Sequence, residues 1–267
     1  MKAVILARGL GKRMRAASRQ ATLDQTQQNA ADTGVKAMIP VGRPFLDYSL
    51  SALADAGIED VCLVTGPEHQ SVIDYYTGPG MPSRVRITFA TQQKPLGTAD
   101  AVLAAEKYVN CGDFLVLNSD NYYPASALSA LCAATSPAIA AFAAGALVEL
   151  GNVTPDRLQR FGALEFGSDD GLSRIAGDPE RARSSGGGTI YCSLNCWSFT
   201  QLIFDACRKV TKSARGEYEL TQAVQLAIDT MSYRIRVVKL HEGVLDLSTR
   251  DDIAAVTDRV SKFSCDP

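Results

Sequence analysis

The chain has 267 residues, 46% of them hydrophobic, so it can bury a sizeable core in one large α/β domain or two small ones. Its formal net charge is −2 and its pI about 5.8, which gives no indication of a surface for nucleic acid or a membrane. No apolar stretch reaches membrane-spanning length, and the apolar run near the N-terminus is too short for a signal peptide.

Strands and helices alternate through the first half of the chain. Strands are predicted over residues 3–7, 61–65, 85–90, 114–118 and 139–146, and helices over residues 45–56, after Pro67, and over 98–108 and 126–134. This alternation predicts an α/β fold with a doubly wound, Rossmann-like, mixed but mainly parallel sheet. Ligands of such sheets gather at the carboxyl ends of the strands.

The second half is predicted to be more antiparallel. Strands are expected over residues 162–166, 172–175 and 189–199, with an Arg/Ser/Gly-rich loop at 181–188 before the last of them. A helix after Glu217, a strand over 234–240 and a helix from Thr249 complete the chain, which contains no internal repeat. We therefore predict a single domain over residues 1–267.

Residues 16–34 interrupt this alternation. Residues 16–32 are rich in Ala and Gln and are followed by Thr33 and Gly34, which predicts a polar helix that ends at the glycine. Its apolar stripe is thin. The insert is therefore interpreted as a lid, a contact in a homo-oligomer or a mobile surface helix.

The seven cysteines include no C-x-x-C pair, and there are only two histidines. A zinc site is therefore not expected. Reduced thiols indicate a cytoplasmic protein.

The first predicted strand leads into a Gly-rich, doubly basic turn. Gly9 and Gly11 let the backbone pass close to a ligand, while Lys12 and Arg13 supply positive charge, a combination that suits a triphosphate. The turn is not a P-loop, because Leu6 stands at the first Gly position. It is not a dinucleotide fingerprint either, because Met14 stands at the third Gly position. A plain strand-to-helix turn stays open at this point.

Four further segments follow in a fixed order. Lys36 precedes an apolar run and a Gly/Pro turn, and residues 92–102 form a loop that enters a helix. Asp120 stands just past the end of a central strand, and Asp246 stands just before the last helix. Each segment is ambiguous alone, but the ordered set is specific.

Taken together, these segments resemble the sugar-1-phosphate nucleotidyltransferases, also called nucleoside-diphosphate-sugar pyrophosphorylases, over about residues 1–260. The opening segment is similar to the family pattern Leu-Ala-Gly-Gly-x-Gly-Thr-Arg-Met/Leu. The matching segments are Leu6-Ala-Arg-Gly-Leu-Gly-Lys-Arg-Met14, Lys36-Ala-Met-Ile-Pro-Val41, Gln93-Lys-Pro-Leu-Gly-Thr-Ala99, Asn118-Ser-Asp120 and Asp246-Leu-Ser-Thr249.

The resemblance implies a GT-A-like nucleotidyltransferase fold and a reaction between a nucleoside triphosphate and a sugar 1-phosphate that gives a nucleotide sugar and pyrophosphate. It implies a nucleotide-binding half over about residues 1–120 and a sugar-binding half over about 121–267. No nucleic acid or membrane partner is expected.

The resemblance also assigns roles to residues. Arg13 would clamp the triphosphate, Lys36 would reach the α-phosphate or the incoming sugar phosphate, and Asp120 with Asp246 would hold Mg²⁺. The implied nucleotide contacts are Leu6, Ala7, Gly9, Gly11, Lys12, Gln93, Gly97, Thr98 and Asp120. The implied sugar contacts are Gly162, Asn195 and Glu219. Simpler interpretations stay open: each aspartate as a helix cap, Lys36 as a solvated lysine, and Gln92 in place of Gln93.

The chain departs from the family pattern at several positions. Arg8 replaces a glycine, so its side chain either grips the triphosphate or points to solvent, and Lys12 replaces a threonine. The insert separates Arg13 from Lys36 in sequence, which puts closure of the loop in question. The family's Glu-Lys-Pro, which meets the sugar phosphate, is replaced by Gly177-Asp-Pro179; Arg181, Arg183 and Lys239 are candidates to supply the missing charge.

Three other functions remain open from the sequence. One is a nucleotidyltransferase that acts on a non-sugar phosphate such as phosphocholine, and another is a catalytically inactive, nucleotide-binding regulatory paralogue. The third is a GT-A glycosyltransferase, for which Ser119-Asp120-Asn121 lacks the second aspartate of a D-x-D pair. The position of the insert beside the basic turn also motivates the hypothesis that it covers the bound nucleotide.

Overall fold

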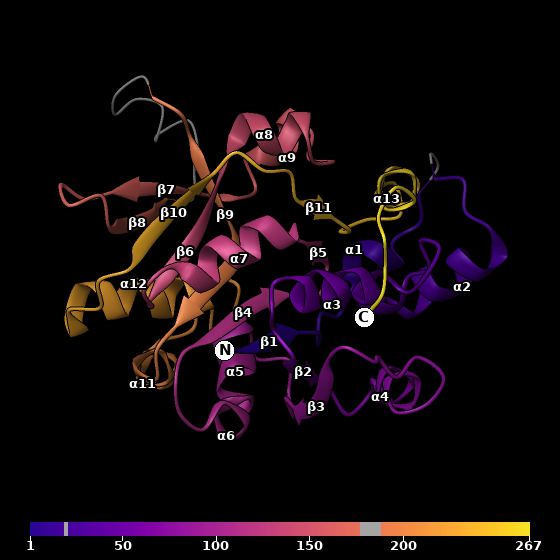
Figure 1. The fold of residues 1–267 in the computed structure, drawn as a ribbon, viewed down its shortest axis with the longest axis horizontal. Helices are drawn as coiled ribbons and strands as arrows, with labels where there is room; N and C mark the ends of the chain where they lie inside the picture. The colour runs from indigo at the N-terminus through magenta and orange to yellow at the C-terminus, as the bar shows by residue number, and fades with distance from the viewer. Residues whose placement is uncertain (19–20, 177–187) are drawn as a thin grey trace.

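A twisted central sheet runs through the computed structural model, which describes residues 1–18, 21–176 and 188–267 (Figure 1). Its strand order is β10-β6-β9-β4-β1-β2-β3. The bounds in chain order are β1 (Lys2–Leu6), β2 (Asp60–Thr65), β3 (Arg86–Thr91), β4 (Phe114–Asn118), β6 (Ala138–Ala143), β9 (Tyr191–Phe199) and β10 (Arg236–Leu240).

Most neighbouring strands run in the same direction. β1 is parallel to both β2 and β4, β2 is parallel to β3, and β10 is parallel to β6, whereas β9 runs antiparallel between β4 and β6. β7 (Gly162–Phe166) pairs antiparallel with β8 (Leu172–Ala176) and β9, and a separate short pair joins β5 (Asn121–Tyr122) to β11 (Leu245–Asp246). The predicted mixed, mainly parallel sheet in a single domain is confirmed.

Helices cover both faces of the sheet, because both faces of its strands are apolar. Along β1, Ala3 and Ile5 belong to one buried cluster, and Val4 and Leu6 belong to the other. The first cluster packs under α3 (Phe45–Asp55), α4 (Gln70–Tyr76) and α7 (Ala125–Ala133). The second packs under α5 (Thr98–Ala104), α11 (Leu202–Lys209) and α12 (Leu220–Met231). The parallel strands therefore end at one shared edge between two helical layers.

The insert is helical over only part of its predicted length. After the short α1 (Lys12–Arg15), helix begins again at α2 (Gln25–Thr33). Asp24 caps α2 through a capping box with Gln27, and Gly34 ends it with a left-handed φ of 74°. Ala31 packs in a third apolar cluster with Ile39, which directly follows η1 (Lys36–Met38), and with residues of α13 (Asp252–Val260). Helix α2 lies at the edge of the molecule (Figure 1).

Other elements also differ from the predictions. The apolar run predicted as a strand over residues 139–146 leaves the sheet after Ala143 and continues as α8 (Ala144–Glu149), since alanine runs are compatible with helix as well as strand. The predicted helix over 98–108 breaks at Ala105 into α5 and α6 (Glu106–Val109). The helices α11 and the short α9 (Pro155–Leu158) were not predicted either.

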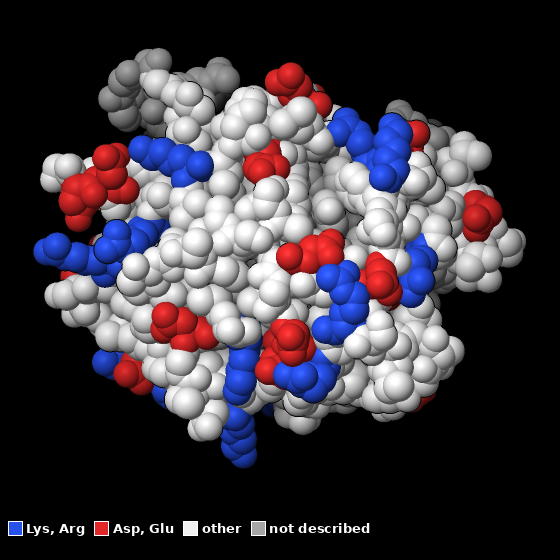
Figure 2. Space-filling view, viewed as in Figure 1, with Lys and Arg blue, Asp and Glu red and all other residues white. Residues whose placement is uncertain are grey.

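Charged side chains are mixed on the surface. On the face shown in Figure 2, lysines and arginines alternate with aspartates and glutamates rather than forming a patch of one sign. Among the residues that the structure describes, no helix combines the length and the apolar character that a membrane span requires.

Candidate active site

A cavity of about 370 Å³ opens at the carboxyl ends of the parallel strands. Segments that follow β1, β3 and β4 line it, together with side chains from the second half of the chain. The lining residues are Leu6, Ala7, Arg8, Gly9, Leu10, Gly11, Lys12, Arg13, Lys36, Gln92, Pro95, Gly97, Thr98, Ala101, Asn118, Ser119, Asp120, Asn195 and Glu217. The cavity therefore brings together the first four of the five sequence segments.

The insert loops out of the basic turn and returns to it. A Cβ on Gly11 (φ 59°) would lie only 2.1 Å from the carbonyl oxygen of Gly34, so the start and end of the insert touch there. Arg15 secures this closure by donating to the carbonyl of Thr33 from Nε at 2.9 Å and from Nη2 at 2.6 Å. Arg13 and Lys36 consequently line one cavity despite their separation in sequence.

The turn itself presents unpaired positive charge. The side chains of Lys12 and Arg13 are exposed and form no ion pair with the described residues. A Cβ added to Gly9 would meet nothing within 4 Å, so its backbone faces open space. No described residue of 21–34 lines the cavity, and these contacts do not support the hypothesis that the insert covers a nucleotide there.

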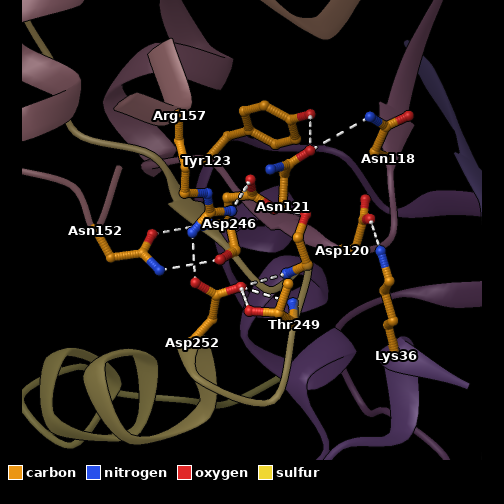
Figure 3. A network of polar contacts seen from close by, with 11 residues as sticks. Lys36, Asn118, Asp120, Asn121, Tyr123, Asn152, Arg157, Asp246, Thr249 and Asp252 are labelled. Carbon is orange, nitrogen blue, oxygen red and sulfur yellow. Dashed lines mark hydrogen bonds and ion pairs between the residues drawn. The ribbon is translucent and has the colours of Figure 1, made fainter. Parts of the chain in front are cut away.

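Lys36 and Asp120 form an ion pair at the floor of the cavity, with Nζ 2.7 Å from Oδ2 (Figure 3). The side chains are 12% and 27% exposed, so Lys36 is not an ordinary solvated lysine. Helix α7 begins after Pro124 and has no side-chain cap, so the Asp120 carboxylate does not serve as one. The pair holds the lysine ammonium beside the end of β4.

Asp246 lies next to this pair but does not line the cavity. Its strand β11 pairs with β5, which places Asp246 opposite Asn121, the residue after Asp120. Burial and the negative charge of nearby Asp120 raise the pKa of Asp246 above its ordinary value of 3.8. The two aspartates therefore come together through one antiparallel bridge between segments far apart in sequence.

Two residues that were not predicted to belong to the site hold Asp246 in place. Arg157 of α9 lies between Asp246 and Asp252; its Nη2 is 2.5 Å from Oδ2 of Asp246 (Figure 3). Asn152 bonds the backbone of Asp246 twice, donating to its oxygen at 2.9 Å and accepting from its nitrogen at 2.7 Å. Neither residue belongs to a segment that carries the resemblance, so only their spatial position reveals the role.

Asp246 does not cap the last helix, because α13 begins at Asp252 and has no side-chain cap. Oδ2 of Asp252 accepts from the backbone nitrogens of Ser248 and Thr249, at 3.0 and 2.7 Å. The oxygens of Asp246 bond to Arg157 and to the hydroxyl of Ser248, the latter at 2.7 Å. The side chain of Asp246 is thus buried and oriented without being used to start the helix.

The opposite end of the cavity is formed by the loop after β3. Gln92 is buried and lines the cavity, whereas the predicted Gln93 is exposed and does not. Nε2 of Gln92 donates to the carbonyl of Gly97 at 2.9 Å and to Asp100 at 2.8 Å. Gly97 (φ 121°) must be glycine, because a Cβ would lie 2.4 Å from the carbonyl oxygen of Tyr218.

The residues predicted to contact a sugar are dispersed. Asn195 lines the cavity, whereas Gly162 pairs with Ser193 in the sheet and Glu219 precedes α12; neither of these two lines it, and Glu217 does. Lys239 pairs with Asp170 at 3.2 Å and lies over the ring of Phe166. Residues 177–179, Arg181 and Arg183 lie outside the described residues.

The carboxylates at this edge fit a divalent cation. No group of three or more His, Cys, Asp or Glu side chains among the described residues could hold a metal. Asp120 and Asp246, however, are the donor set that Mg²⁺ uses when phosphate oxygens and water complete its shell. Burial, and after it the negative charge of Asp120, raises the pKa of Asp246, and a bound cation would offset both effects.

Known proteins of similar sequence carry nucleotidyltransferase names. The chain is 28% identical over 231 residues to the low-salt glycan biosynthesis nucleotidyltransferase Agl11 of Haloferax volcanii, covering 86% of the chain and 57% of that protein. It is 31% identical over 234 residues to a glucose-1-phosphate thymidylyltransferase of Streptomyces antibioticus, covering 86% and 58%. To the UTP–glucose-1-phosphate uridylyltransferase AglF of Haloferax volcanii it is 29% identical over 256 residues, covering 94% and 93%. The chain thus spans little more than half the length of the first two.

Solved structures support the fold. A UDP-glucose pyrophosphorylase complexed with UDP-glucose superposes with a TM-score of 0.73 at 16% identity, covering 98% of each chain. The family model described as nucleotidyl transferase matches residues 2–262, nearly the whole chain. The family predicted from the resemblance is therefore confirmed: the chain belongs to the nucleotidyl transferase family.

Proposed function

We propose that the chain transfers a nucleotidyl group from a nucleoside triphosphate to a sugar 1-phosphate. An oxygen of the sugar phosphate attacks the α-phosphorus, the bond from that phosphorus to the α–β bridging oxygen breaks, and pyrophosphate leaves with the bonding electrons. The observation that carries this proposal is the convergence of the basic turn, Lys36 and Asp120 on one cavity. Relatives named as glucose-1-phosphate thymidylyl- and uridylyltransferases support it.

The two exposed cations of the basic turn bind the triphosphate. Lys12 and Arg13 line the cavity and have no partners in the part of the chain that the structure describes, so their donors are available to phosphate oxygens. Lys36, held by Asp120, lies ready to approach the α-phosphate or the incoming phosphate. Charge neutralisation and positioning of this kind supply most of the rate of phosphoryl-group transfer.

Asp120 and Asp246 would hold Mg²⁺, which would neutralise phosphate charge and act as a Lewis acid on the phosphate oxygens. Asn152 and Arg157 fix the position of Asp246, and the bridge between β5 and β11 fixes its separation from Asp120.

The two substrates are proposed to bind side by side in the cavity at the carboxyl ends of the parallel strands. We assign the nucleotide to the half that comprises about residues 1–120, with Gln92 and Gly97 at the base, and the sugar to the half from about 121, with Asn195 facing the cavity. Seven cysteines without a disulfide support a cytoplasmic location for the reaction.

The test is release of pyrophosphate with Mg²⁺ from each of UTP, dTTP, CTP, GTP and ATP, paired with a panel of sugar 1-phosphates. At least one pair is expected to turn over. The variant Lys36→Met is expected to lose that turnover, while Lys107→Met, at an exposed lysine outside the cavity, keeps it.

Failure of every pair would overturn the proposal. Turnover only with phosphocholine or another phosphorylated alcohol would move the acceptor to the non-sugar class. Tight nucleotide binding without turnover of any acceptor would instead identify a regulatory nucleotide-binding protein.

A further inference from the structure

Arg8 differs from the other cations of the turn, because its side chain is almost entirely buried. Only 7% of the side chain is exposed, although the residue lines the cavity. Its Nε and Nη2 donate to the two carboxylate oxygens of Glu68, each at 3.1 Å. The side chain therefore does not point to solvent, which was one of the two possibilities open from the sequence.

The guanidinium is held in place but incompletely satisfied. Its Nη1 is buried and has no hydrogen-bond partner among the described residues. A buried charged donor without an acceptor costs free energy, so native structures rarely keep one without a purpose. A ligand that enters the cavity with an acceptor at this wall would satisfy it.

Arg8 lies at the end of the cavity opposite the Lys36–Asp120 pair. The strand order β4-β1-β2-β3 places Asp120 on one side of β1 and the segments after β2 and β3 on the other. Arg8 reaches toward the latter, because a Cβ on Gly66, directly after β2, would lie 2.2 Å from its Nε. Gln92 is fixed beside that strand by the bond from its backbone nitrogen to the carbonyl of Thr65, at 2.8 Å.

This end of the cavity offers donors and an acceptor together. The side-chain Nε2 of Gln92 donates to Gly97 and Asp100, while its Oε1 accepts no hydrogen bond from the described residues. Phosphate oxygens only accept, so the acceptor Oε1 does not suit a phosphate. A base edge that has a carbonyl oxygen beside a ring N–H matches both the guanidinium and Oε1.

We propose that Arg8 reads the base of the triphosphate: its guanidinium donates to a carbonyl oxygen of the base, while Oε1 of Gln92 accepts from the neighbouring ring N–H. This inference rests on the proposed function. Uracil, thymine and guanine have such an edge. Cytosine and adenine do not, because cytosine N3 is an acceptor and adenine has no carbonyl oxygen. Arg8 is thereby a specificity-determining residue.

The experiment measures equilibrium binding to the full chain by calorimetry with Mg²⁺, using UTP, the size-matched CTP, and inorganic tripolyphosphate as a ligand without a base. The wild-type protein is expected to bind UTP more tightly than CTP. Arg8→Gly, which installs the glycine of the family pattern, is expected to weaken UTP binding about tenfold or more and to leave tripolyphosphate binding unchanged. Arg86→Gly, at an exposed arginine outside the cavity, is the control.

A second variant tests the proposal in case Arg8→Gly does not fold. Glu68→Gln leaves Arg8 in place but removes the carboxylate that orients it, and Glu68 does not line the cavity. It is expected to lower the ratio of UTP affinity to CTP affinity without changing tripolyphosphate binding.

Each contrary outcome is distinct. An equal loss of tripolyphosphate binding would make Arg8 a phosphate ligand, and equal losses for UTP and CTP would remove its role in base choice; either result overturns the proposal. No change in Arg8→Gly overturns it as well. If the wild-type protein binds no triphosphate at all, the proposed function itself fails.

Discussion

The basic turn and the Asp246 network meet at one edge of the sheet but are built in opposite ways. In the turn, Lys12 and Arg13 are exposed and have no partners among the described residues. In the network, Asp246 is buried, bonded to Arg157 and Ser248 through its carboxylate and to Asn152 through its backbone. The difference indicates that the two regions have different roles in binding. Groups that must grip a ligand are left unsatisfied, while a carboxylate that must keep its position is held by the protein.

The sharpest test of the network is Arg157→Met. Removing the guanidinium leaves two buried carboxylates without their counter-charge, so the free energy of unfolding is expected to fall by about 3 kcal/mol or more. Urea unfolding measures it. Arg160→Met, at an exposed arginine three residues away, is the control and is expected to change little. Equal losses in the two variants would contradict the structural role of Arg157.

The matching test of the turn is Arg13→Gln. Because Arg13 is exposed and pairs with no described residue, the free energy of unfolding is expected to stay within about 0.5 kcal/mol of the wild type. The kcat/KM for pyrophosphate release is expected to fall about 100-fold, as when one donor to a developing charge is removed. Unfolding and activity are measured on the same sample. A much larger fall in the free energy of unfolding of Arg13→Gln would show that Arg13 also stabilises the fold.

Arg250, which follows the Asp246 segment in sequence, contacts α1 beside the basic turn. Replacing it is expected to have an intermediate effect on the free energy of unfolding. Its buried side chain donates to the carbonyl oxygens of Met14 and Arg15, at 2.8 and 3.3 Å, and pairs with Asp32 of the insert at 2.5 Å. Arg250→Ala is expected to cost about 1–3 kcal/mol of unfolding free energy. Arg234→Ala, at an exposed arginine, is the control. A cost no larger than that of the control would mean that α1 and the insert are held by apolar packing alone.

The smallest expected effect is a pH dependence at the flank of the turn. His69 is 4% exposed, and its Nδ1 accepts from the backbone nitrogen of Gly66 at 3.0 Å. Burial lowers the pKa of His69 below its ordinary value of 6.5. The unfolded chain therefore binds the proton more readily, and the stability contributed by His69 is present above pH 6.5 and lost as the pH falls below it.

Urea unfolding at pH values on either side of 6.5 measures this loss. His69→Asn is expected to reduce the slope of stability against pH, whereas His241→Asn, at the exposed second histidine, leaves it unchanged. A slope that survives in His69→Asn would place the titrating group elsewhere.

Much of the fold could be predicted because its signals are local. The runs that form β1, β2 and β4 are apolar on both faces, which is the pattern of a strand buried between two helical layers. The end of α2 at Gly34 was likewise predictable, since a glycine in the left-handed conformation ends a helix through its own backbone. The start of α2 at Gln25 differs from the predicted start at residue 16, because the capping box of Asp24 and Gln27 lies within a uniformly polar stretch.

The candidate site was predictable only where a motif carries the chemistry. Arg13, Lys36 and Asp120 were located by their segments, and the structure places all three at one cavity. The choice between Gln92 and Gln93 could not be made from sequence, because adjacent residues at a strand end point in opposite directions and only the register decides which one faces inward.

Periodicity and short motifs depend on neighbouring residues, so the alternation of strands and helices, the family and the position of the charged segments follow from the amino-acid sequence. The partners of those charges follow from the way the chain folds. Arg157 meets Asp246 across 89 positions of sequence, and Arg8 turns toward Glu68 across 60. Such contacts follow from strand order and the path of distant loops, for which no local pattern of residues is a guide.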